Sequence, residues 1–320
     1  MKLFALRVVE IILLPLTFIS AAWSRLLATA GWKNAVVSEK VFMMFGVLPV
    51  RDYYTEPLVA PARHLKFPLD KDRLLPGIDM NVDVQLQILN SFSYADEFKR
   101  FPLTRPNGGE RKFFFNNGSY MSGDAEYLYS IIRHFKPRKL IEIGSGNSTL
   151  IAIEAIRENF REQPSHSIEH ICVEPFLQPW LEKTSAKIIR EKVEDLDKSI
   201  FQSLSANDIL FIDSSHIIRP QGDVLFEYLE LLPLLKPGVI VHVHDIFTPK
   251  DYLHDWIYKE HLMWNEQYIF EAFLSMNKEF EIIGAVNYLS HHHRQLFSSK
   301  CPIFAQQQGR EPGAFWIRRK

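Results

Sequence analysis

Aspartate and histidine side chains follow two short apolar runs of this sequence. Asp213 and His216 come after the first run, and His244 and Asp245 come after the second. An imidazole has an ordinary pKa of about 6.5, so a neutral histidine here could accept a proton from a hydroxyl group as a general base. Asp213, His244 and Asp245 could instead hold a divalent ion that acidifies and orients the same hydroxyl. The residues alone leave three alternatives open: base catalysis by histidine, activation by a metal ion, or a cluster with a structural role only.

A glycine turn is the strongest single motif. Residues 140–149 read LIEIGSGNST, an apolar run that passes directly into a turn and a helix start. Gly144 and Gly146 allow a sharp turn and a close approach to a ligand, and Ser148 and Thr149 stand where the helix begins. The motif predicts a cofactor pocket at the end of a strand. Thr149 replaces the third glycine of the dinucleotide fingerprint, which disfavours a nicotinamide cofactor.

Glu174 ends the next apolar run, ICVE, 30 residues after Gly144. A carboxylate at this position can accept hydrogen bonds from both hydroxyls of a ribose. Capping of the following helix is the alternative. The segment FFFNNGSYMSGD, residues 113–124, precedes the glycine turn and combines aromatic with polar side chains. It suits an adenosine-sized ligand or a core anchor followed by a helix cap.

Alternating strands and helices must position these residues. Short β-branched runs predict strands, and amphipathic stretches between them predict helices, which together specify a doubly wound α/β fold with a mostly parallel sheet. The predicted strands are residues 139–143, 168–173, 186–190, 208–212 and 239–243, followed by 280–286 and 313–318. The last two are expected to pair antiparallel across a long loop, residues 287–312, in which His291–His293 would be solvated.

These motifs resemble those of class I S-adenosylmethionine-dependent methyltransferases, whose E-x-G-x-G motif appears here as Glu142, Gly144 and Gly146. The resemblance covers residues 113–318 and implies a Rossmann-like methyltransferase sheet that ends in an antiparallel strand. It also implies a donor site that includes Glu142, Gly144, Ser145, Gly146, Ser148, Thr149, Glu174 and Asp213. The loop would lie against the amino-acid end of the donor, and Glu174 would bind the ribose.

The second cluster is similar to that of metal-dependent sugar O-methyltransferases, which carry D-x-x-H after the fourth strand. That similarity implies Asp213 and Asp245 as metal ligands and His216 as the base. Those enzymes commonly have an acidic residue where this chain has His244, and histidine favours softer metals than magnesium. The expected activity is O-methylation of a small molecule, a sugar or a membrane-proximal glycan. A non-catalytic S-adenosylmethionine-binding scaffold at a membrane is the main alternative, ahead of an NAD-linked oxidoreductase.

The rest of the chain predicts three regions. Residues 1–34 contain the apolar stretch VVEIILLPLTFISAAW with basic residues on both sides, which indicates a membrane-associating segment. Proline-rich residues 35–112 would form a lid or a substrate-side extension, and residues 113–320 the methyltransferase domain. A net charge of -1 disfavours a nucleic-acid partner. Because the methyl donor is made in the cytosol, we expect a cytoplasmic protein, on the cytosolic face of a membrane if the apolar segment binds one. The sequence does not indicate an oligomeric state.

Overall fold

Seven strands form one sheet in the order β3-β2-β1-β4-β5-β7-β6. The computed structural model describes residues 2–53, 55–106, 108 and 111–320. The strands are β1 (Lys139–Ile143), β2 (Glu169–Val173), β3 (Lys187–Ile189), β4 (Ile209–Ile212), β5 (Ile240–Val243), β6 (Phe280–Ala285) and β7 (Phe315–Arg319). Strand β7 runs antiparallel to both of its neighbours, and the pairings among β1 to β5 are parallel. The predicted mostly parallel sheet with an antiparallel C-terminal strand is therefore confirmed.

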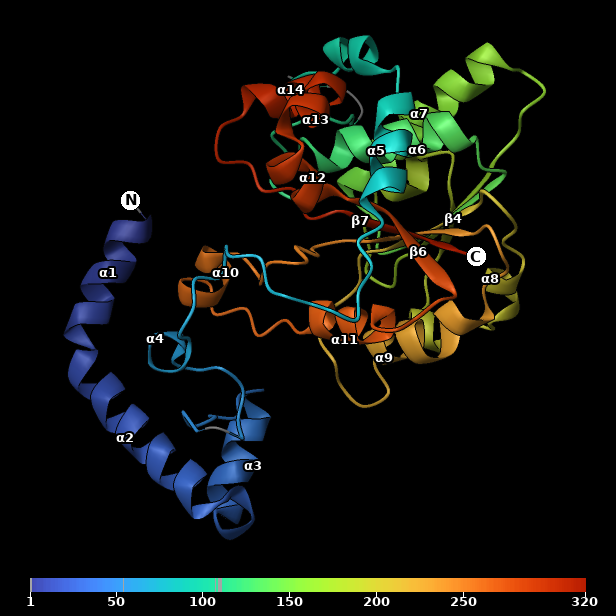
Figure 1. Cartoon of the computed structure of the whole chain (residues 1–320). Helices are drawn as coiled ribbons and strands as arrows, with labels where there is room; N and C mark the ends of the chain where they lie inside the picture. Colours follow the sequence, from blue (N-terminus) through green and yellow to red (C-terminus); the bar gives the residue numbers. More distant parts are fainter. Residues whose placement is uncertain (1, 54, 107, 109–110) are drawn as a thin grey trace. The chain divides into compact units, whose positions relative to one another are not determined.

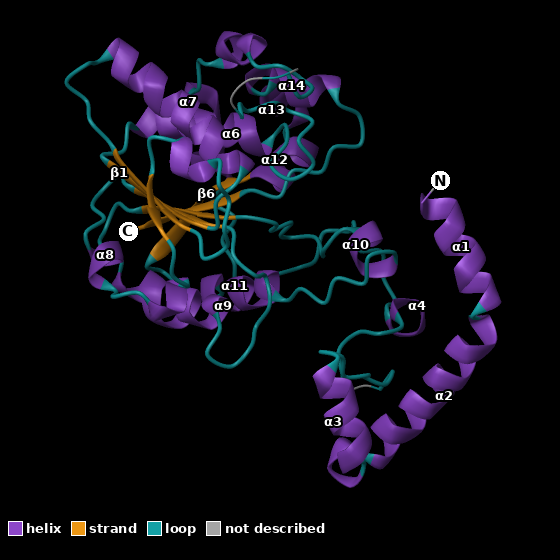
Figure 2. Cartoon of the chain, turned by 180° about the vertical axis from the view of Figure 1, so that it is seen from behind, coloured by secondary structure: helices purple, strands orange, loops and turns teal. Residues whose placement is uncertain are grey.

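Helices cover both faces of the sheet (Figures 1 and 2). On one face lie α5 (Val82–Ser91), α6 (Asp124–Phe135), α7 (Asn147–Glu162), α12 (Val286–His292), α13 (Arg294–Lys300) and α14 (Pro302–Gln306). On the other face lie α8 (Ser199–Gln202), α9 (Asp223–Phe226), a π-helical turn (Glu227–Leu231) and α11 (Glu266–Leu274). Short 3-10 turns over Leu181–Lys183, Val193–Asp195 and Leu232–Leu234 complete the connections.

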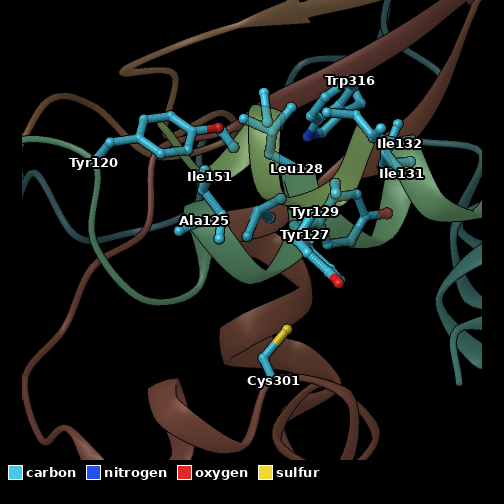
Figure 3. Packing of buried hydrophobic residues seen from close by; sticks show 14 of the residues in the cluster. Tyr120, Ala125, Tyr127, Leu128, Tyr129, Ile131, Ile132, Ile151, Cys301 and Trp316 are labelled. Atoms are coloured by element: carbon cyan, nitrogen blue, oxygen red, sulfur yellow. The ribbon is translucent and has the colours of Figure 1, made fainter. Parts of the chain in front are cut away.

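Alternation along the strands divides the core into two hydrophobic clusters. Leu140 of β1 packs with the α6 and α7 side of the sheet, whereas Ile141 and Ile143 pack with the α9 and α11 side. Successive strand residues point to opposite faces, so the apolar runs of β1 and β4 are buried on both sides. Figure 3 shows α6 side chains, including Leu128, beside Trp316 of β7. This packing fixes the strand ends that carry the polar residues.

The connection from β6 to β7 differs from the predicted long loop. It contains the three short helices α12, α13 and α14, and Leu289 and Phe297 in it are buried against the core. His291 and His292 are exposed to solvent, as expected, and they pair with Glu311 and Asp72 at the surface. Tertiary burial stabilises these short helices, which are too short to be stable alone.

The described residues fall into two compact units. One contains the described part of Met1–Pro68 together with His254–Met263, and the other contains Leu69–Leu253 and Trp264–Lys320. The first unit consists of α1 (Lys2–Ile12), α2 (Leu14–Ala30), α3 (Val36–Met44), α4 (Pro61–His64) and α10 (His254–Tyr258). Within the described residues, α1 and α2 are each too short to cross a membrane. As a pair bent by 67°, Leu6–Ile12 and Leu14–Ala30 have the length and composition for a broken span.

Candidate active site

The two glycines of the β1–α7 turn have different surroundings. Gly144 has a φ of +78°, in the left-handed region, and a Cβ there would lie 1.9 Å from the backbone oxygen of Asp213. A Cβ at Gly146 would meet nothing within 4 Å. Gly144 is therefore required because the turn packs against the end of β4, whereas an added Cβ at Gly146 would enter open space.

Glu142 lies beneath the turn and is fully buried. Its carboxylate accepts hydrogen bonds from the hydroxyls of Thr149 (2.8 Å) and Ser148 (3.3 Å) and contacts His170 Nε2 at 2.6 Å. Glu142 and Thr149 are absent from the walls of the cavities described below. They organise the turn from behind. His170 was not predicted, although a histidine in the apolar run of β2, four residues before Glu174, was a visible signal.

Two adjoining cavities lie at the carboxyl ends of β1, β2 and β4, and both are lined by Gly144, Glu174 and Asp213. The first has a volume of about 360 Å³ and is lined further by Val173, Pro175, Phe176, Val193, Glu194, Ser214 and Arg219 among others. The second has a volume of about 320 Å³ and is lined further by Ser119, Tyr120, Ser145, Gly146, Asn147, Ser148, Gln178 and Arg111. Cavities of this size and position are typical of nucleotide-sized ligands on α/β sheets.

Glu174 contributes to both the loop structure and the cavity wall. One carboxylate oxygen accepts the Phe176 N–H at 2.9 Å, and the other accepts the Ser145 N–H at 3.2 Å. These bonds tie the β2 end to the glycine turn. A carboxylate offers about four acceptor positions, so capacity remains on the cavity side. Ribose binding by Glu174 stays a prediction.

The residues after β4 and β5 meet in one cluster with the start of α11. His216 Nε2 lies 3.3 Å from an Asp213 carboxylate oxygen and 3.6 Å from one of Asp245. Its Nδ1 lies 2.7 Å from a Glu266 oxygen, and the Trp264 ring lies over the imidazole with centroids 4.3 Å apart. His216 and Asp245 have positive φ values of 61° and 56°. Such strain at residues other than glycine is concentrated at functional sites.

The electrostatics of this cluster oppose one expectation from the sequence. Burial alone would lower the pKa of His216, but its hydrogen bonds to Asp213 and Glu266 outweigh burial and raise the pKa well above the ordinary value. His216 is therefore charged at neutral pH before the donor binds, and not neutral as we expected from an unperturbed imidazole. A cation that enters beside it would reverse this balance.

The pKa values of the two aspartates shift in opposite directions. Burial disfavours the ionised Asp213, yet the charges of His244 and His216 lower its pKa to about 2. Burial raises the pKa of Asp245, against the attraction of His244 and His216. His244 is buried, its Nε2 lies 3.4 Å from Asp245, and its Nδ1 has no hydrogen-bond partner among the described residues. Neighbouring groups with separated pKa values are typical of acid–base sites.

The cluster also fits a metal ion. Asp213, His216 and Asp245 each offer a ligand atom, and these atoms lie within 4.8 Å of one another. With Nδ1 committed to Glu266, His216 Nε2 faces two carboxylates, an arrangement that favours a proton or a metal cation between them. A bound divalent ion would supply acidification of an acceptor hydroxyl. His244 points to Asp245 and is not part of this set.

Glu266 and Glu227 are the functional candidates that sequence reasoning missed here. Glu266 is fully buried and also accepts the Tyr228 hydroxyl at 2.9 Å. Glu227 lies in the π-helical turn, accepts the Ser214 hydroxyl at 3.0 Å and has one unpartnered oxygen among the described residues. Glutamate at a helix start is ordinary capping chemistry, so residue type and position alone did not distinguish Glu266.

Comparison with known proteins identifies the central part of the chain. A family model described as a methyltransferase domain matches residues 141–246, which span both clusters. Residues 141–246 therefore match a methyltransferase domain. An uncharacterized protein of Archaeoglobus fulgidus is 32% identical to this chain over 149 residues, which are 45% of this chain and 65% of that protein. The match therefore spans just under two thirds of the relative.

Solved structures give more distant similarities to this chain. The O-methyltransferase TomG of Streptomyces achromogenes matches with a TM-score of 0.37 and 11% identity, over 76% of this chain and 92% of TomG. An O-methyltransferase of Bacillus cereus matches with a TM-score of 0.35 and 10% identity, over 74% and 91%. At this distance the fold assignment rests on the strand order of the chain itself, in which an antiparallel β7 separates β5 from β6.

Proposed function

We propose that the chain is an S-adenosylmethionine-dependent O-methyltransferase acting on a hydroxyl of a small molecule or glycan. The observation that carries this proposal is the position of the Asp213–His216–Asp245 cluster beside the cavities. Asp213 lines both cavities and also lies 3.3 Å from His216. A donor held against Gly146 and Glu174 would place its methyl group near the base, as transfer to a hydroxyl requires.

Glu266 determines which nitrogen of His216 can act. Glu266 accepts a hydrogen bond from Nδ1–H, so Nε2 is the atom that faces the aspartates and the reacting hydroxyl. The sulfonium of the donor is a cation, and its arrival would lower the pKa of His216 toward the range of a general base. The same geometry supports metal-assisted activation, with Asp213 and Asp245 as ligands.

The experiment has two parts, donor binding and methyl transfer. Calorimetry with S-adenosylhomocysteine measures binding, and tritiated donor with a panel of hydroxyl-bearing sugars and small molecules measures transfer. We expect His216→Ala to lower turnover by about 10²–10⁴ with donor affinity nearly unchanged, because a base acts in the transition state. Failure to bind S-adenosylhomocysteine would reject the proposal. Donor binding without turnover on any acceptor would instead favour the scaffold alternative.

Chelation separates the two modes of hydroxyl activation. If a metal ion participates, a chelator removes activity from the wild type and added divalent ion restores it, while Asp245→Ala stays inactive in both conditions. If His216 acts without a metal, the chelator leaves activity unchanged. Asp255→Ala is the control, because Asp255 is exposed and pairs with Lys259.

We also propose that α1 and α2 attach the protein to the cytosolic face of a membrane. Leu16, Phe18 and Ile19 are 61%, 76% and 64% exposed, and such clustered apolar exposure is rare on surfaces that stay in water. Flotation of the full chain with vesicles that contain anionic lipid tests this proposal. Binding that persists unchanged in a Phe18→Asp and Ile19→Asp variant would reject it.

A further inference from the structure

The helices α1 and α2 are apolar on all sides where they meet. Between Arg7 and Arg25 the sequence carries a single charge, Glu10, and each of residues 8–23 is exposed in the structure. A helix that lies flat on a membrane surface has one apolar face and one strongly polar face. A helix that is apolar all round needs an apolar environment on every side. This segment therefore fits immersion in hydrocarbon and not attachment along one face.

The bend between the helices limits how deep the segment can reach. Leu13 separates α1 from α2 with a φ of -88° and a ψ of 2°, Pro15 lies in the first turn of α2, and the pair is bent by 67° (Figure 1). A rise of about 1.5 Å per residue places Arg25 about 18 Å from Leu13 along α2. With both helices tilted equally, a bend of 67° sets Leu13 about 10 Å below Arg25, about a third of the hydrocarbon core. This V-shaped wedge of α1 and α2 therefore ends within one leaflet.

The backbone at the bend is hydrogen-bonded without water. The Leu13 N–H donates to the Val9 carbonyl at 2.9 Å, and the N–H and the hydroxyl of Thr17 both donate to the Leu13 carbonyl, at 3.0 and 3.2 Å. Pro15 has no N–H that needs a partner. Unpaired backbone groups are costly in hydrocarbon, so these bonds allow the bend to lie in lipid.

Basic residues stand at both ends of the wedge. Arg7 precedes the apolar stretch, Arg25 and Lys33 follow it, and Trp23 beside Arg25 is exposed. Basic residues mark the cytosolic side of a membrane, and tryptophan is enriched at the interface. A single crossing would put one basic end on the far side, whereas entry and exit through one anionic face keep both at the headgroups. Glu10 follows Arg7 by three residues, a helical spacing at which the two charges can pair.

We propose that the wedge enters one leaflet of an anionic membrane with Leu13 foremost and leaves by the same face. The inference rests on the proposed membrane attachment and defines its partner and its depth. Both ends of the wedge then stay on the side of the membrane that holds the cavities of the sheet-containing unit.

Cysteine labelling tests this topology. The full chain is made by cell-free synthesis with sealed vesicles that contain anionic lipid, and a charged, impermeant maleimide is added outside. The natural Cys172 and Cys301 are buried, so the wild type gives the background. We expect Phe4→Cys and Lys33→Cys to react equally before and after detergent. Leu13→Cys should react at least about tenfold more slowly until detergent is added, because a charged reagent does not enter hydrocarbon.

Two controls make each outcome decisive. Leu74→Cys should react in every condition, because Leu74 is 91% exposed and lies outside the wedge. Leu13→Cys should react as fast as Leu74→Cys when vesicles are omitted, and protection there would assign the wedge to a second copy of the chain and overturn the proposal. Protection of Phe4→Cys on sealed vesicles would show a crossing. Full labelling of Leu13→Cys on bound protein would show helices that lie on the surface.

The last two results would overturn the wedge and leave the membrane attachment standing. Failure of the attachment itself would appear separately, because the chain would then not float with the vesicles.

Discussion

The glycine turn and the aspartate–histidine cluster lie at neighbouring strand ends, but their carboxylates differ in how fully protein groups satisfy them. Glu142 under the turn is fully buried and has three protein partners, two hydroxyls and an imidazole. Asp213 and Asp245 face the same imidazole nitrogen at 3.3 and 3.6 Å, and their pKa values move apart. A carboxylate whose hydrogen bonds are all made within the protein gives a rigid support for a cofactor. A carboxylate whose charge is incompletely satisfied remains available for chemistry.

The largest effect on donor binding should come from a side chain at Gly146. Gly146→Val places methyl groups in the open space of the turn, so we expect donor affinity to fall by at least about 100-fold with the melting temperature nearly unchanged. Gly144→Ala is the contrast, because its Cβ strikes the Asp213 backbone and should lower the melting temperature. Calorimetry and thermal unfolding of both variants check this. Equal loss of stability in the two would contradict the division of roles.

A smaller effect, on turnover, is expected from Glu266, which positions His216. Glu266→Gln keeps one acceptor oxygen for Nδ1–H of His216 but removes the negative charge beside the imidazole, so turnover should fall by about 10–100-fold while donor affinity stays constant. Steady-state kinetics with a confirmed acceptor and calorimetry make the measurement. Glu230→Gln is the control, since Glu230 is exposed and pairs with Lys198. Unchanged turnover in Glu266→Gln would separate Glu266 from catalysis.

The contact between His170 and Glu142, which supports the glycine turn, can be removed by substitution. His170→Leu removes the imidazole partner of buried Glu142, and we expect a loss of about 1–3 kcal/mol in unfolding free energy together with weaker donor binding. His170→Gln keeps a donor and should recover part of both losses. Urea unfolding and calorimetry test the pair. Loss of stability with full donor affinity would mean that Glu142 holds the turn without His170.

The smallest effect concerns Glu227, and it depends on pH. Burial and the charges of Glu266 and Asp223 raise its pKa well above the ordinary 4.5. The folded state therefore keeps a proton that the unfolded chain releases, and stability falls as pH rises above about 4.5 toward the folded pKa. Each unit of that difference is worth about 1.4 kcal/mol. Glu227→Gln removes the penalty, so we expect it to gain stability over the wild type between pH 5 and pH 8.

Urea unfolding of Glu227→Gln and the wild type at both pH values measures this gain. A stability difference that is the same at pH 5 and pH 8 would contradict a protonated Glu227. It would also mean that Glu227, which accepts the Ser214 hydroxyl, is as well satisfied by its partners as Glu142 below the glycine turn.

Local pattern was sufficient for the elements with strong apolar periodicity. Strand β1 begins and ends at the predicted residues, and the other strands differ by one or two residues at their ends. The helices of residues 286–306 were missed because they are short and their stability comes from burial of residues such as Leu289 and Phe297. Between β4 and β5, α9 continues into a π-helical turn at Glu227–Leu231, which periodicity does not reveal.

The sequence by itself determined the α/β order, the glycine turn and the polar residues at the strand ends, because these depend on spacing along the chain. Only the tertiary structure decided which glycine can carry a side chain without a clash, since Gly144 is constrained by Asp213, 69 residues further along. It likewise brought Glu266 to His216 and Arg111 to the glycine turn. The charge of His216 follows from those long-range contacts, because a pKa is set by the groups that packing places around it.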